Sequence, residues 1–439
     1  MTLPQPAWST VPLRELVAEV RLKVDPKEAD GLPFVGMDHI ESQSMRLLGT
    51  VPAATMRSAA VRFEPGDVLY GRLRPYLNKV HRTESRGLGS AEFLVLTPAP
   101  AVDADYLSLV LNSGSFVRFA SRLNTGDRPR VTFDQIGGYP VPLPPLKEQR
   151  RIAWEVHQQL SRLHAAQGDL KRVLPSIAIL RTAVAAAATS GKLVPPEAEL
   201  GLPYEAAAGL VRRMAAEGRS RRERRNGIEA ADPSSKALPA GWAWARLRDL
   251  GELDRGISKH RPRNAPALYG GPYPFIQTGD IRRSDGTIRT HSQSYNEVGL
   301  AQSRLWPAGT LCITIAANIA ETAVLTYPVC FPDSVAGFVH PGETATTRYV
   351  QLCFYAMKQR LWELAPATAQ KNINLRTLDA ILIPLPPLKE QRRIVEEAEK
   401  LFSLAQSAET IALATLSRSR QLRGSLLSTA IHRVPAVSK

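Results

Sequence analysis

The stretch "PLPPLKEQRRI" occupies residues 142–152, and the same eleven letters return at residues 384–394, 242 positions further on. Consecutive prolines keep the preceding chain extended and can supply the first residue of a helix. Charged residues follow at once in each copy. Each string therefore predicts an extended exit from one block of structure and the abrupt start of a helix.

A good helix start explains the prolines and the charges of the string, but not the identity of the residues around them. Identity is expected if both copies bind the same partner, and equally if both copies pack in the same way. The letters alone leave these two explanations open.

The repeat extends far beyond the string. Five further pairs of segments match in the same order, at offsets of 234 to 243 residues. The pairs are "WSTVPLREL" (8–16) with "WAWARLRDL" (242–250), "LPFVGMDHI" (32–40) with "YPFIQTGDI" (273–281), "FEPGDVL" (63–69) with "WPAGTLC" (306–312), "DYLSLVLNS" (105–113) with "RYVQLCFYA" (348–356), and "LRTAV" (180–184) with "LRGSL" (422–426). The sequence therefore predicts two copies of one unit, each a divergent block followed by a similar tail.

The tails have the pattern of long helices. In the first tail, mostly apolar residues recur about every 3.5 positions, the spacing of a coiled-coil seam, at residues 152, 156, 160, 163, 166, 170, 173, 177, 180 and 184. Pro175 should kink this helix. The second seam is more polar, at residues 394, 398, 401, 404, 408, 411, 415, 418, 422 and 425. Two long helices, each with one apolar stripe, are expected to pack on each other.

Each block is expected to be mixed α/β, with short strands bounded by Pro/Gly turns. We expect strands at 61–63, 68–70 and 92–96 in the first block and at 310–315, 323–325 and 336–339 in the second, with one helix in each at 103–123 and 347–364. The fold class is therefore α+β: two mixed α/β domains separated by two long antiparallel coiled-coil helices, with an internal pseudo-twofold repeat.

The expected boundaries follow from the repeat. They are a first domain at 1–143, a first long helix at 144–190, a helix and basic linker at 191–237, a second domain at 238–385, a second long helix at 386–433 and a tail at 434–439. The linker carries a basic cluster of Arg221, Arg222, Arg224 and Arg225. This cluster is read as a solvated linker, with contact to a DNA backbone as the alternative.

Composition narrows the class of protein. The 439 residues carry a net charge of +15, which favours a polyanionic partner such as nucleic acid, although species bias toward arginine would give the same balance. No run of about 20 apolar residues and no signal peptide is evident, so we expect a cytoplasmic protein with no membrane partner. Three scattered cysteines, Cys312, Cys330 and Cys353, fit a reducing compartment and neither a disulfide framework nor a zinc site.

Motifs of catalysis are missing from the sequence. It has no complete Walker A pattern, no H-E-x-x-H, no G-x-S-x-G and no dinucleotide fingerprint, and its eight histidines lack ligand spacing. We therefore expect no catalytic residue and no metal site, and a protein that recognises nucleic acid rather than an enzyme.

With these features in place, the chain resembles the DNA-specificity (S) subunit of type I restriction-modification enzymes. The resemblance covers nearly the whole chain and rests on "LPPLKEQRRI" twice, "YPFIQTGDI", "WPAGTLCITIAANIAETAVL", "CFPDSVAGF", "AQKNINLRTL" and "LRTAVAAAATSGKLV". The first block departs more, with "YGRLRPYLNKV" where the second has "ITIAANIAETAV" and "TGDRPRVTFDQI" where the second has "TAQKNINLRTL".

The resemblance implies a function and a set of partners. Two target-recognition domains would each read one half of a bipartite, asymmetric site on double-stranded DNA, and two helices would fix their spacing. Two methyltransferase (M) subunits and the restriction (R) subunits would assemble on this chain in phage defence. The chain itself would bind no cofactor, with S-adenosylmethionine, ATP and Mg on the partner subunits.

Side-chain chemistry suggests which residues contact DNA, because Arg, Asn, Gln, Ser and Thr read base edges while Lys and Arg hold phosphates. In the first block we expect these contacts from Arg72, Arg74, Tyr76, Asn78, Lys79, Arg128 and Arg130. In the second block we expect them from Arg282, Arg283, Gln302, Ser303, Asn318, Gln370, Lys371 and Asn372. For any one of them, a merely solvent-facing side chain is the alternative.

The repeated string is the expected partner-binding surface, because two identical helix starts could meet two copies of one subunit. The expected residues are Lys147, Gln149, Arg150, Arg151, Lys389, Gln391, Arg392 and Arg393. Three other readings remain: a specificity-like DNA-targeting subunit of another phage-defence complex, a self-contained methyltransferase or nuclease, and an adaptor that does not bind DNA.

Overall fold

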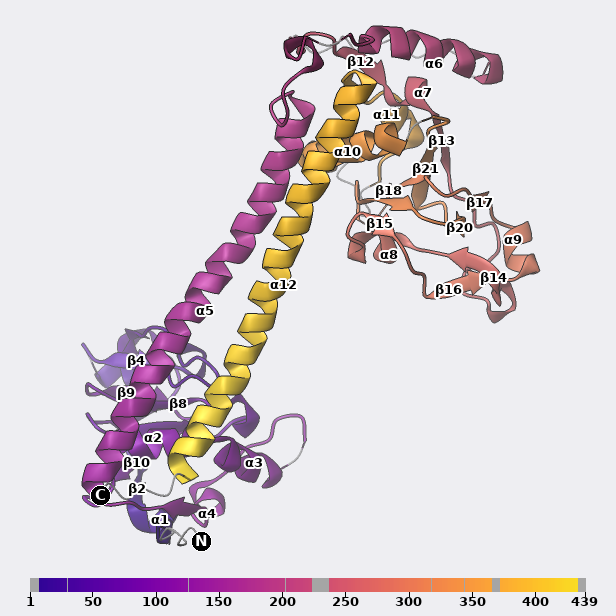
Figure 1. The fold of residues 1–439 in the computed structure, drawn as a ribbon. Coiled ribbons are helices and arrows are strands. Elements are labelled where there is room, and N and C mark those ends of the chain that lie inside the picture. Colours follow the sequence, from indigo (N-terminus) through magenta and orange to yellow (C-terminus); the bar gives the residue numbers. More distant parts are fainter. Residues whose placement is uncertain are drawn as a thin grey trace, which may run out of the picture. The chain divides into compact units, whose positions relative to one another are not determined.

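The computed structural model describes residues 8–29, 31–124, 126–201, 203–222, 237–316, 318–342, 344–364 and 372–432. The chain divides into two compact units: unit 1 is Met1–Arg172 with Ala412–Lys439, and unit 2 is Val173–Ile411. Two long helices, α5 (Leu146–Thr189) and α12 (Leu388–His432), each contribute one end to each unit (Figure 1).

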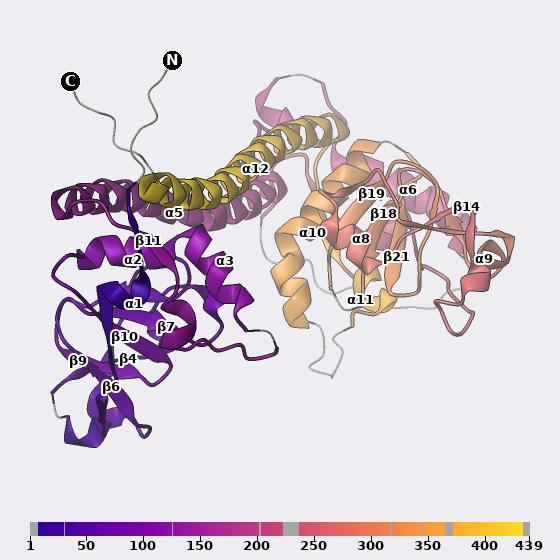
Figure 2. The same ribbon diagram turned by 90° about the horizontal axis from the view of Figure 1, so that it is seen from below.

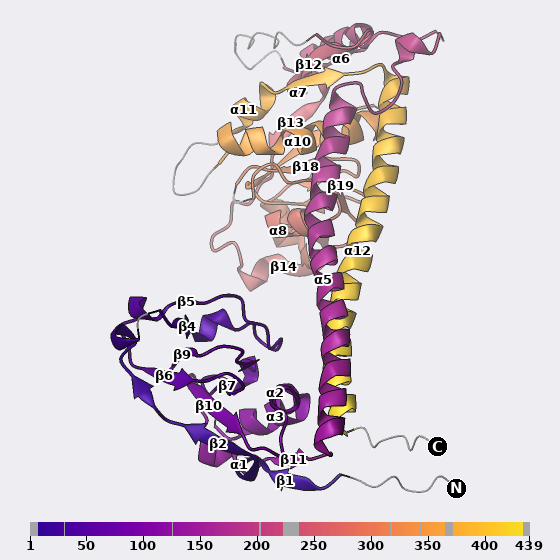
Figure 3. The same cartoon turned by 90° about the vertical axis from the view of Figure 1, so that its left-hand side faces the viewer.

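Unit 1 is layered. One sheet has the order β2-β10-β7-β8, with β2 at Val17–Val20, β10 at Phe93–Pro98, β7 at Val68–Gly71 and β8 at Val80–Arg82. A second sheet has the order β3-β6-β9-β4-β5, with β3 at Lys23–Val24, β6 at Ala60–Phe63, β9 at Gly87–Ser90, β4 at Pro33–Val35 and β5 at Val51–Pro52. The strands of the first sheet are apolar on both faces, because one face packs on the second sheet and the other on helices (Figure 3).

The helices of unit 1 complete its core. α2 (Ala104–Asn112) and α3 (Gly114–Arg122) cover the sheet that holds β7 and β10 (Figure 2). The single helix expected at 103–123 is in fact these two helices, because Ser113 takes an extended conformation and caps α3 by accepting from the amide of Phe116. A short pair of strands, β1 (Thr10–Pro12) and β11 (Pro140–Pro142), leads into α5; the short helix α1 (Leu13–Leu16) follows β1, and the short helix α4 (Phe133–Ile136) precedes β11.

Unit 2 repeats this topology, with one more edge strand in its main sheet and one fewer in its second sheet. Its main sheet has the order β13-β21-β18-β19-β15, with β13 at Glu252–Arg255, β21 at Val335–Val339, β18 at Leu311–Thr314, β19 at Thr322–Leu325 and β15 at Thr287–Ile288. The second sheet has the order β16-β14-β20-β17, with β16 at Gln293–Tyr295, β14 at Tyr269–Phe275, β20 at Val329–Cys330 and β17 at Leu305–Trp306. The pair β12 (Ala243–Arg246) and β22 (Leu382–Leu385) leads into α12 as β1 and β11 lead into α5.

Some of the remaining helices of unit 2 have counterparts in unit 1. α10 (Thr344–Leu364) covers the main sheet, and α11 (Leu375–Asp379) precedes β22 as α4 precedes β11. The others are α6 (Ala207–Arg222), α7 (Leu247–Leu250), α8 (Thr278–Arg283) and α9 (Glu297–Ala301). The predicted α+β class with an internal repeat is therefore confirmed. Of the predicted basic cluster, Arg224 and Arg225 lie outside the described residues.

The repeated string shares two internal contacts between the units. Gln149 donates from Nε2 to the carbonyl of Pro144 at 2.8 Å, and Gln391 donates to the carbonyl of Pro386 at 2.8 Å. In both copies a tyrosine hydroxyl donates to the carbonyl of the first proline of the string. The donor is Tyr106 of α2 in unit 1, at 2.8 Å, and Tyr349 of α10 in unit 2, at 2.5 Å. Shared packing therefore accounts for part of the identity of the two strings.

The two long helices pair within each unit. The predicted seam is buried at Ile152, Val156, Leu160, Ile177 and Val184 of α5 and at Ile394 and Ala398 of α12, but not along its whole length. In unit 1 the first turns of α5 lie beside the last turns of α12, and in unit 2 the last turns of α5 lie beside the first turns of α12. The predicted seam residues Leu404, Ile411 and Leu422 are exposed at 60%, 65% and 56%, while small residues such as Ala405 and Ala412 are buried. A straight helix has 3.6 residues per turn, so a stripe repeating every 3.5 residues rotates away from the contact line.

Polar side chains occupy part of the contact line between the helices. In unit 1, Gln167 donates to Ser419 at 2.7 Å, and in unit 2 Arg181 pairs with Glu409 at 2.8 Å. On α5 the predicted seam positions Val173 and Leu180 are likewise exposed. α5 is one unbroken helix that contains Pro175.

α5 also corrects the expectation that no stretch is long and apolar enough to span a membrane. A window of eighteen residues in it has a mean hydropathy of 1.3, with 22% of that window buried. Length and composition of one helix are weak evidence, because the core helices of soluble proteins meet the same criterion.

Candidate nucleic-acid interface

In unit 1 the connection between β7 and β8 meets a distant segment of the chain. Leu73 bridges Arg130, and the amide of Arg74 donates to the carbonyl of Pro129 at 2.7 Å. This contact gathers predicted DNA-binding residues from two separate stretches. We call Arg72, Arg74, Tyr76, Arg128 and Arg130 the unit 1 loop cluster.

The backbone of this connection is held in an unusual conformation. Arg74 has φ 53° and Asn78 has φ 45°, on either side of a single 3-10 turn, Pro75–Leu77. Non-glycine residues in the left-handed region are uncommon and concentrate at functional sites. The turn leaves Tyr76 exposed at 47%, as a ring that stacks on a base or sugar requires.

Arg130 is held by a carboxylate. Its guanidinium contacts Glu92 at 2.8 Å and lowers the pKa of that carboxyl. Both side chains are partly exposed, so a phosphate would compete with Glu92 for the guanidinium.

Two predicted contacts in this connection point into the protein instead. Asn78 is only 2% exposed and donates from Nδ2 to the carbonyl of Asn112 at 3.2 Å. Lys79 donates from Nζ to the carbonyl of Met37. The prediction of a DNA contact is therefore wrong for Asn78, because its buried side chain has no surface for DNA. The side chain of Lys79 holds the start of β8 against the backbone at Met37.

Unit 2 has the same arrangement in the same place. The connection between β18 and β19 meets the segment before α11, where Ala316 bridges Asn372 and the amide of Ile373 donates to the carbonyl of Ile315 at 2.9 Å. Arg282, at the end of α8, donates from Nη1 to Oδ1 of Asn318 at 3.1 Å. We call Arg282, Asn318 and Asn372 the unit 2 loop cluster.

Arg283, Gln302 and Ser303, which were also predicted to contact DNA, do not join this cluster. Arg283 pairs with Asp280 within α8 at 2.7 Å. Gln302 and Ser303, at the end of α9, bond instead to the connection between β13 and β14. Gln370 and Lys371 lie outside the described residues.

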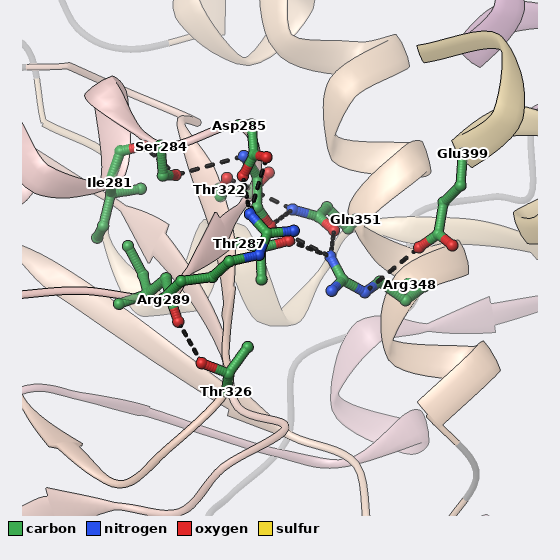
Figure 4. A network of polar contacts seen from close by, with 12 residues as sticks. Ile281, Ser284, Asp285, Thr287, Arg289, Thr322, Thr326, Arg348, Gln351 and Glu399 are labelled. Carbon is green, nitrogen blue, oxygen red and sulfur yellow. Dashed lines mark hydrogen bonds and ion pairs between the residues drawn. The ribbon is translucent and has the colours of Figure 1, made fainter. Parts of the chain in front are cut away.

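A polar network fixes the turn that follows α8 (Figure 4). Arg348 of α10 donates from Nη1 to the carbonyl of Gly286 at 3.2 Å and to Oγ1 of Thr287 at 3.1 Å, while Gln351 donates to the same carbonyl at 2.7 Å. Arg348 also lies 3.6 Å from a carboxylate oxygen of Glu399 on α12. Burial lowers the pKa of Arg348. The network therefore links α12 and α10 to the turn behind Arg282.

A cavity of about 600 Å³ lies beside this network, between α10, α12, the end of α5 and the turn after α8. Its cations are paired: Arg181 with Glu409, Arg289 with Asp285, Lys358 with Glu321 and Arg348 with Glu399. Such a wall has little uncompensated positive charge to attract a phosphate, so it differs in kind from the loop clusters.

The repeated strings divide into exposed and buried residues. Lys147, Arg150, Lys389 and Arg392 are exposed, as a partner-binding surface requires. Arg151 pairs with Glu148 and Glu155 along its own helix, and Arg393 pairs with Glu197. Gln149 and Gln391 are fully buried. The prediction of partner contact is corrected for these two glutamines, because each is enclosed at its helix start by the carbonyl it bonds.

The environment of the second string contains a residue that the sequence did not single out. Glu390 is fully buried and accepts from the indole N–H of Trp242 at 2.9 Å and from the amide of Glu197 at 3.0 Å. Its counterpart Glu148 lies at the helix surface and bonds Arg151. The sequence gave no signal for this difference, because both copies carry the same string and a tryptophan at the equivalent position, Trp8 and Trp242.

Comparison with known proteins identifies the class. A family model for the type I restriction modification DNA specificity domain matches residues 239–412. The EcoDI specificity subunit of Escherichia coli is 26% identical over 181 residues, which are 40% of this chain and 40% of that protein. The EcoBI specificity subunit of Escherichia coli is 23% identical over 304 residues, 66% of this chain and 57% of that protein. The chain thus matches about half the length of these relatives.

Solved structures extend the likeness to the fold of the whole chain. One, from work on complex assembly and conformational transition of the type I R-M system, has a TM-score of 0.72 at 19% identity and covers 99% of this chain and 100% of its own. The HsdS subunit of Thermoanaerobacter tengcongensis has a TM-score of 0.60 at 20% identity, covering 99% of each chain.

The fold is that of the specificity subunits of type I restriction-modification systems. Residues 239–412 match the family model of the specificity domain itself. The resemblance found in the sequence is confirmed.

Proposed function

We propose that this chain is the DNA-recognition subunit of a type I restriction-modification complex, acting in the cytoplasm on a bipartite, asymmetric DNA site. The unit 1 loop cluster reads one half-site and the unit 2 loop cluster reads the other. The chain performs no chemistry, and S-adenosylmethionine, ATP and Mg act on the partner subunits.

One observation carries the proposal: equivalent hairpins in the two units meet equivalent downstream segments, through the Leu73–Arg130 and Ala316–Asn372 bridges. The frame is the same, but the polar side chains on it differ. Arginine reads guanine and asparagine reads adenine through paired hydrogen bonds in the major groove. Equal frames with unequal side chains suit two half-sites of unequal sequence.

The partners follow from the two helix starts. Lys147 and Arg150 in unit 1, and Lys389 and Arg392 in unit 2, offer the same exposed charges. We propose that each start receives one methyltransferase subunit, and that restriction subunits join the assembly. Charge reversal at Arg150 and Arg392 tests this surface, because it should abolish co-purification of the methyltransferase while a chain with Lys192→Glu retains it.

The DNA sites are tested by mapping methylated adenines in a host that carries the complex. Arg282→Ala should relax base preference in one half of the motif and Arg130→Ala in the other, each by about 1 to 3 kcal/mol at the affected position. If both variants relaxed base preference in the same half-site, the assignment of one half-site to each loop cluster would be wrong. Co-purification of effectors other than methyltransferase and restriction subunits would instead favour a targeting subunit of another defence complex.

A further inference from the structure

The connection between β13 and β14, residues 256–268, carries a positive surface that lies outside both loop clusters. Arg255, Lys259, His260, Arg261 and Arg263 are all exposed. Among the described residues, no hydrogen bond or ion pair to a carboxylate side chain is recorded for Arg255, Lys259 or Arg261, apart from the contact of the Arg255 amide with Asp254. This positive charge is therefore largely uncompensated.

Nearby carboxylates are already engaged by other arginines. Glu252 and Asp254 on β13 both pair with Arg304, at 3.1 and 3.7 Å. Asp333 pairs with Arg263 at 2.7 Å. These acidic side chains are therefore paired with Arg304 and Arg263 rather than with the side chains of Arg255 and Lys259.

The connection is braced although it contains no strand. Gln302 accepts from the amide of His260 at 3.0 Å through Oε1, and its carbonyl accepts from the amide of Lys259. Ser303 donates to the carbonyl of Ile257 at 2.9 Å. These are the two residues that the sequence suggested as direct DNA contacts, and their side chains hold this backbone instead.

Further contacts fix both ends of the segment. The amide of Gly256 donates to the carbonyl of Val335 at 2.8 Å, and a Cβ at this position would lie 2.4 Å from the carbonyl oxygen of Phe331. Arg261 donates from Nη1 to the carbonyls of Ser258 and His260, at 2.7 and 2.8 Å. Preorganisation of this kind lowers the entropy lost when a loop binds.

We propose that residues 255–263 form a phosphate-binding site for the backbone of duplex DNA, with Arg255 and Lys259 as the contacting cations. Gln302 and Ser303 are positioning residues of this site. The inference rests on the proposed DNA-recognition function and adds to unit 2 a sequence-independent backbone contact, separate from its base-reading loop cluster. Lysine suits this role because it acts as a point charge on phosphate, whereas base reading favours fork-shaped donors.

The test compares the affinity of the full-length chain, within the complex in which it is purified, for its target duplex and for a scrambled duplex. Lys259→Ala and Arg255→Ala should weaken binding to both duplexes by the same factor. Each lost phosphate contact should lower the salt slope by about 0.9, so that the advantage of the unaltered chain shrinks roughly 3-fold between about 50 and 200 mM salt. Lys192→Ala, another exposed lysine of unit 2, should leave affinity and slope unchanged.

Gln302→Ala separates positioning from direct contact. It should weaken binding to both duplexes and also speed hydrogen exchange of the amides at 257–262, whereas Lys259→Ala should weaken binding without that change in exchange. Unchanged exchange in the Gln302 variant would overturn the positioning role.

The outcomes distinguish this inference from the function on which it rests. If the unaltered complex binds no duplex, the proposed function and the inference both fall. If the complex binds DNA and the Lys259 and Arg255 variants match Lys192→Ala, only the phosphate site is overturned. If either variant loses affinity for the target duplex alone, the residue reads bases, and the phosphate assignment is again wrong.

Discussion

Replacing Glu390 with alanine is expected to destabilise unit 2 severely, while the same change at Glu148, the same letter of the repeated string, should be mild. Glu390 accepts two buried hydrogen bonds, from Trp242 and from the amide of Glu197. Its removal leaves two buried donors without acceptors, each costing about 1 to 3 kcal/mol, and a cavity in addition. Allowing for relief of a buried charge, we expect a loss of about 3 to 5 kcal/mol.

The control lies in the same chain. Glu148 bonds Arg151 at the surface of α5 with its side chain 23% exposed, and exposed pairs of this kind contribute below about 1 kcal/mol. Hydrogen exchange of the full-length chain in increasing denaturant reports the opening free energy of β12 and β22 in unit 2 and of β1 and β11 in unit 1. A loss below about 1 kcal/mol for Glu390→Ala, or equal losses for the two variants, would refute the reasoning.

Three further outcomes are expected. Burial raises the pKa of Glu390 above the ordinary 4.5, so the carboxyl of Glu390 holds its proton more tightly in the folded protein than in the unfolded chain. This protonation contributes fully to the folding stability of unit 2 below pH 4.5, and the contribution is lost as pH rises through the raised pKa. Denaturant titrations across this range should show that Glu390→Gln flattens this pH dependence of unit 2. Arg348→Ala should cost about 1.5 to 3 kcal/mol and speed hydrogen exchange in the turn after α8, whereas Arg289→Ala, which removes an exposed pair, should cost below about 1 kcal/mol. Gln149→Ala should destabilise unit 1 more than Gln391→Ala destabilises unit 2, because Gln149 also donates to the carbonyl of Ala101 and accepts from the amide of Asp103. Each buried partner left unsatisfied should cost about 1 to 3 kcal/mol, and equal losses measured by hydrogen exchange would contradict this difference.

The sequence could predict what depends on local pattern. β6, β7, β10, β18, β19 and β21 overlap the expected strands, and α10 and α12 begin within a few residues of the expected positions. The repeat itself was visible because both copies of the fold keep the residues that begin their helices, such as the prolines before α5 and α12. These features depend on residues that are neighbours in the chain, so the local sequence is enough to predict them.

What the sequence could not predict depends on contacts between distant residues. Leu73 and Arg130 meet across a long stretch of chain, and no periodicity signals that bridge. Asn78 was taken for a surface residue because asparagine is polar, yet its amide satisfies a carbonyl inside the unit. The periodicity of α12 predicted an apolar stripe on this helix, but it did not predict which side of the helix is buried, since Ile411 is exposed and Ala412 is buried.

The equivalence of the two helix starts bears on how such a chain can evolve. Gln149 and Gln391 donate to the equivalent proline carbonyls, those of Pro144 and Pro386. A genetic crossover at this string would join the first block to the second tail, or the second block to the first tail, and leave every residue of the junction unaltered. Recombination at this string can therefore exchange recognition blocks without changing the amino-acid sequence of the helix start.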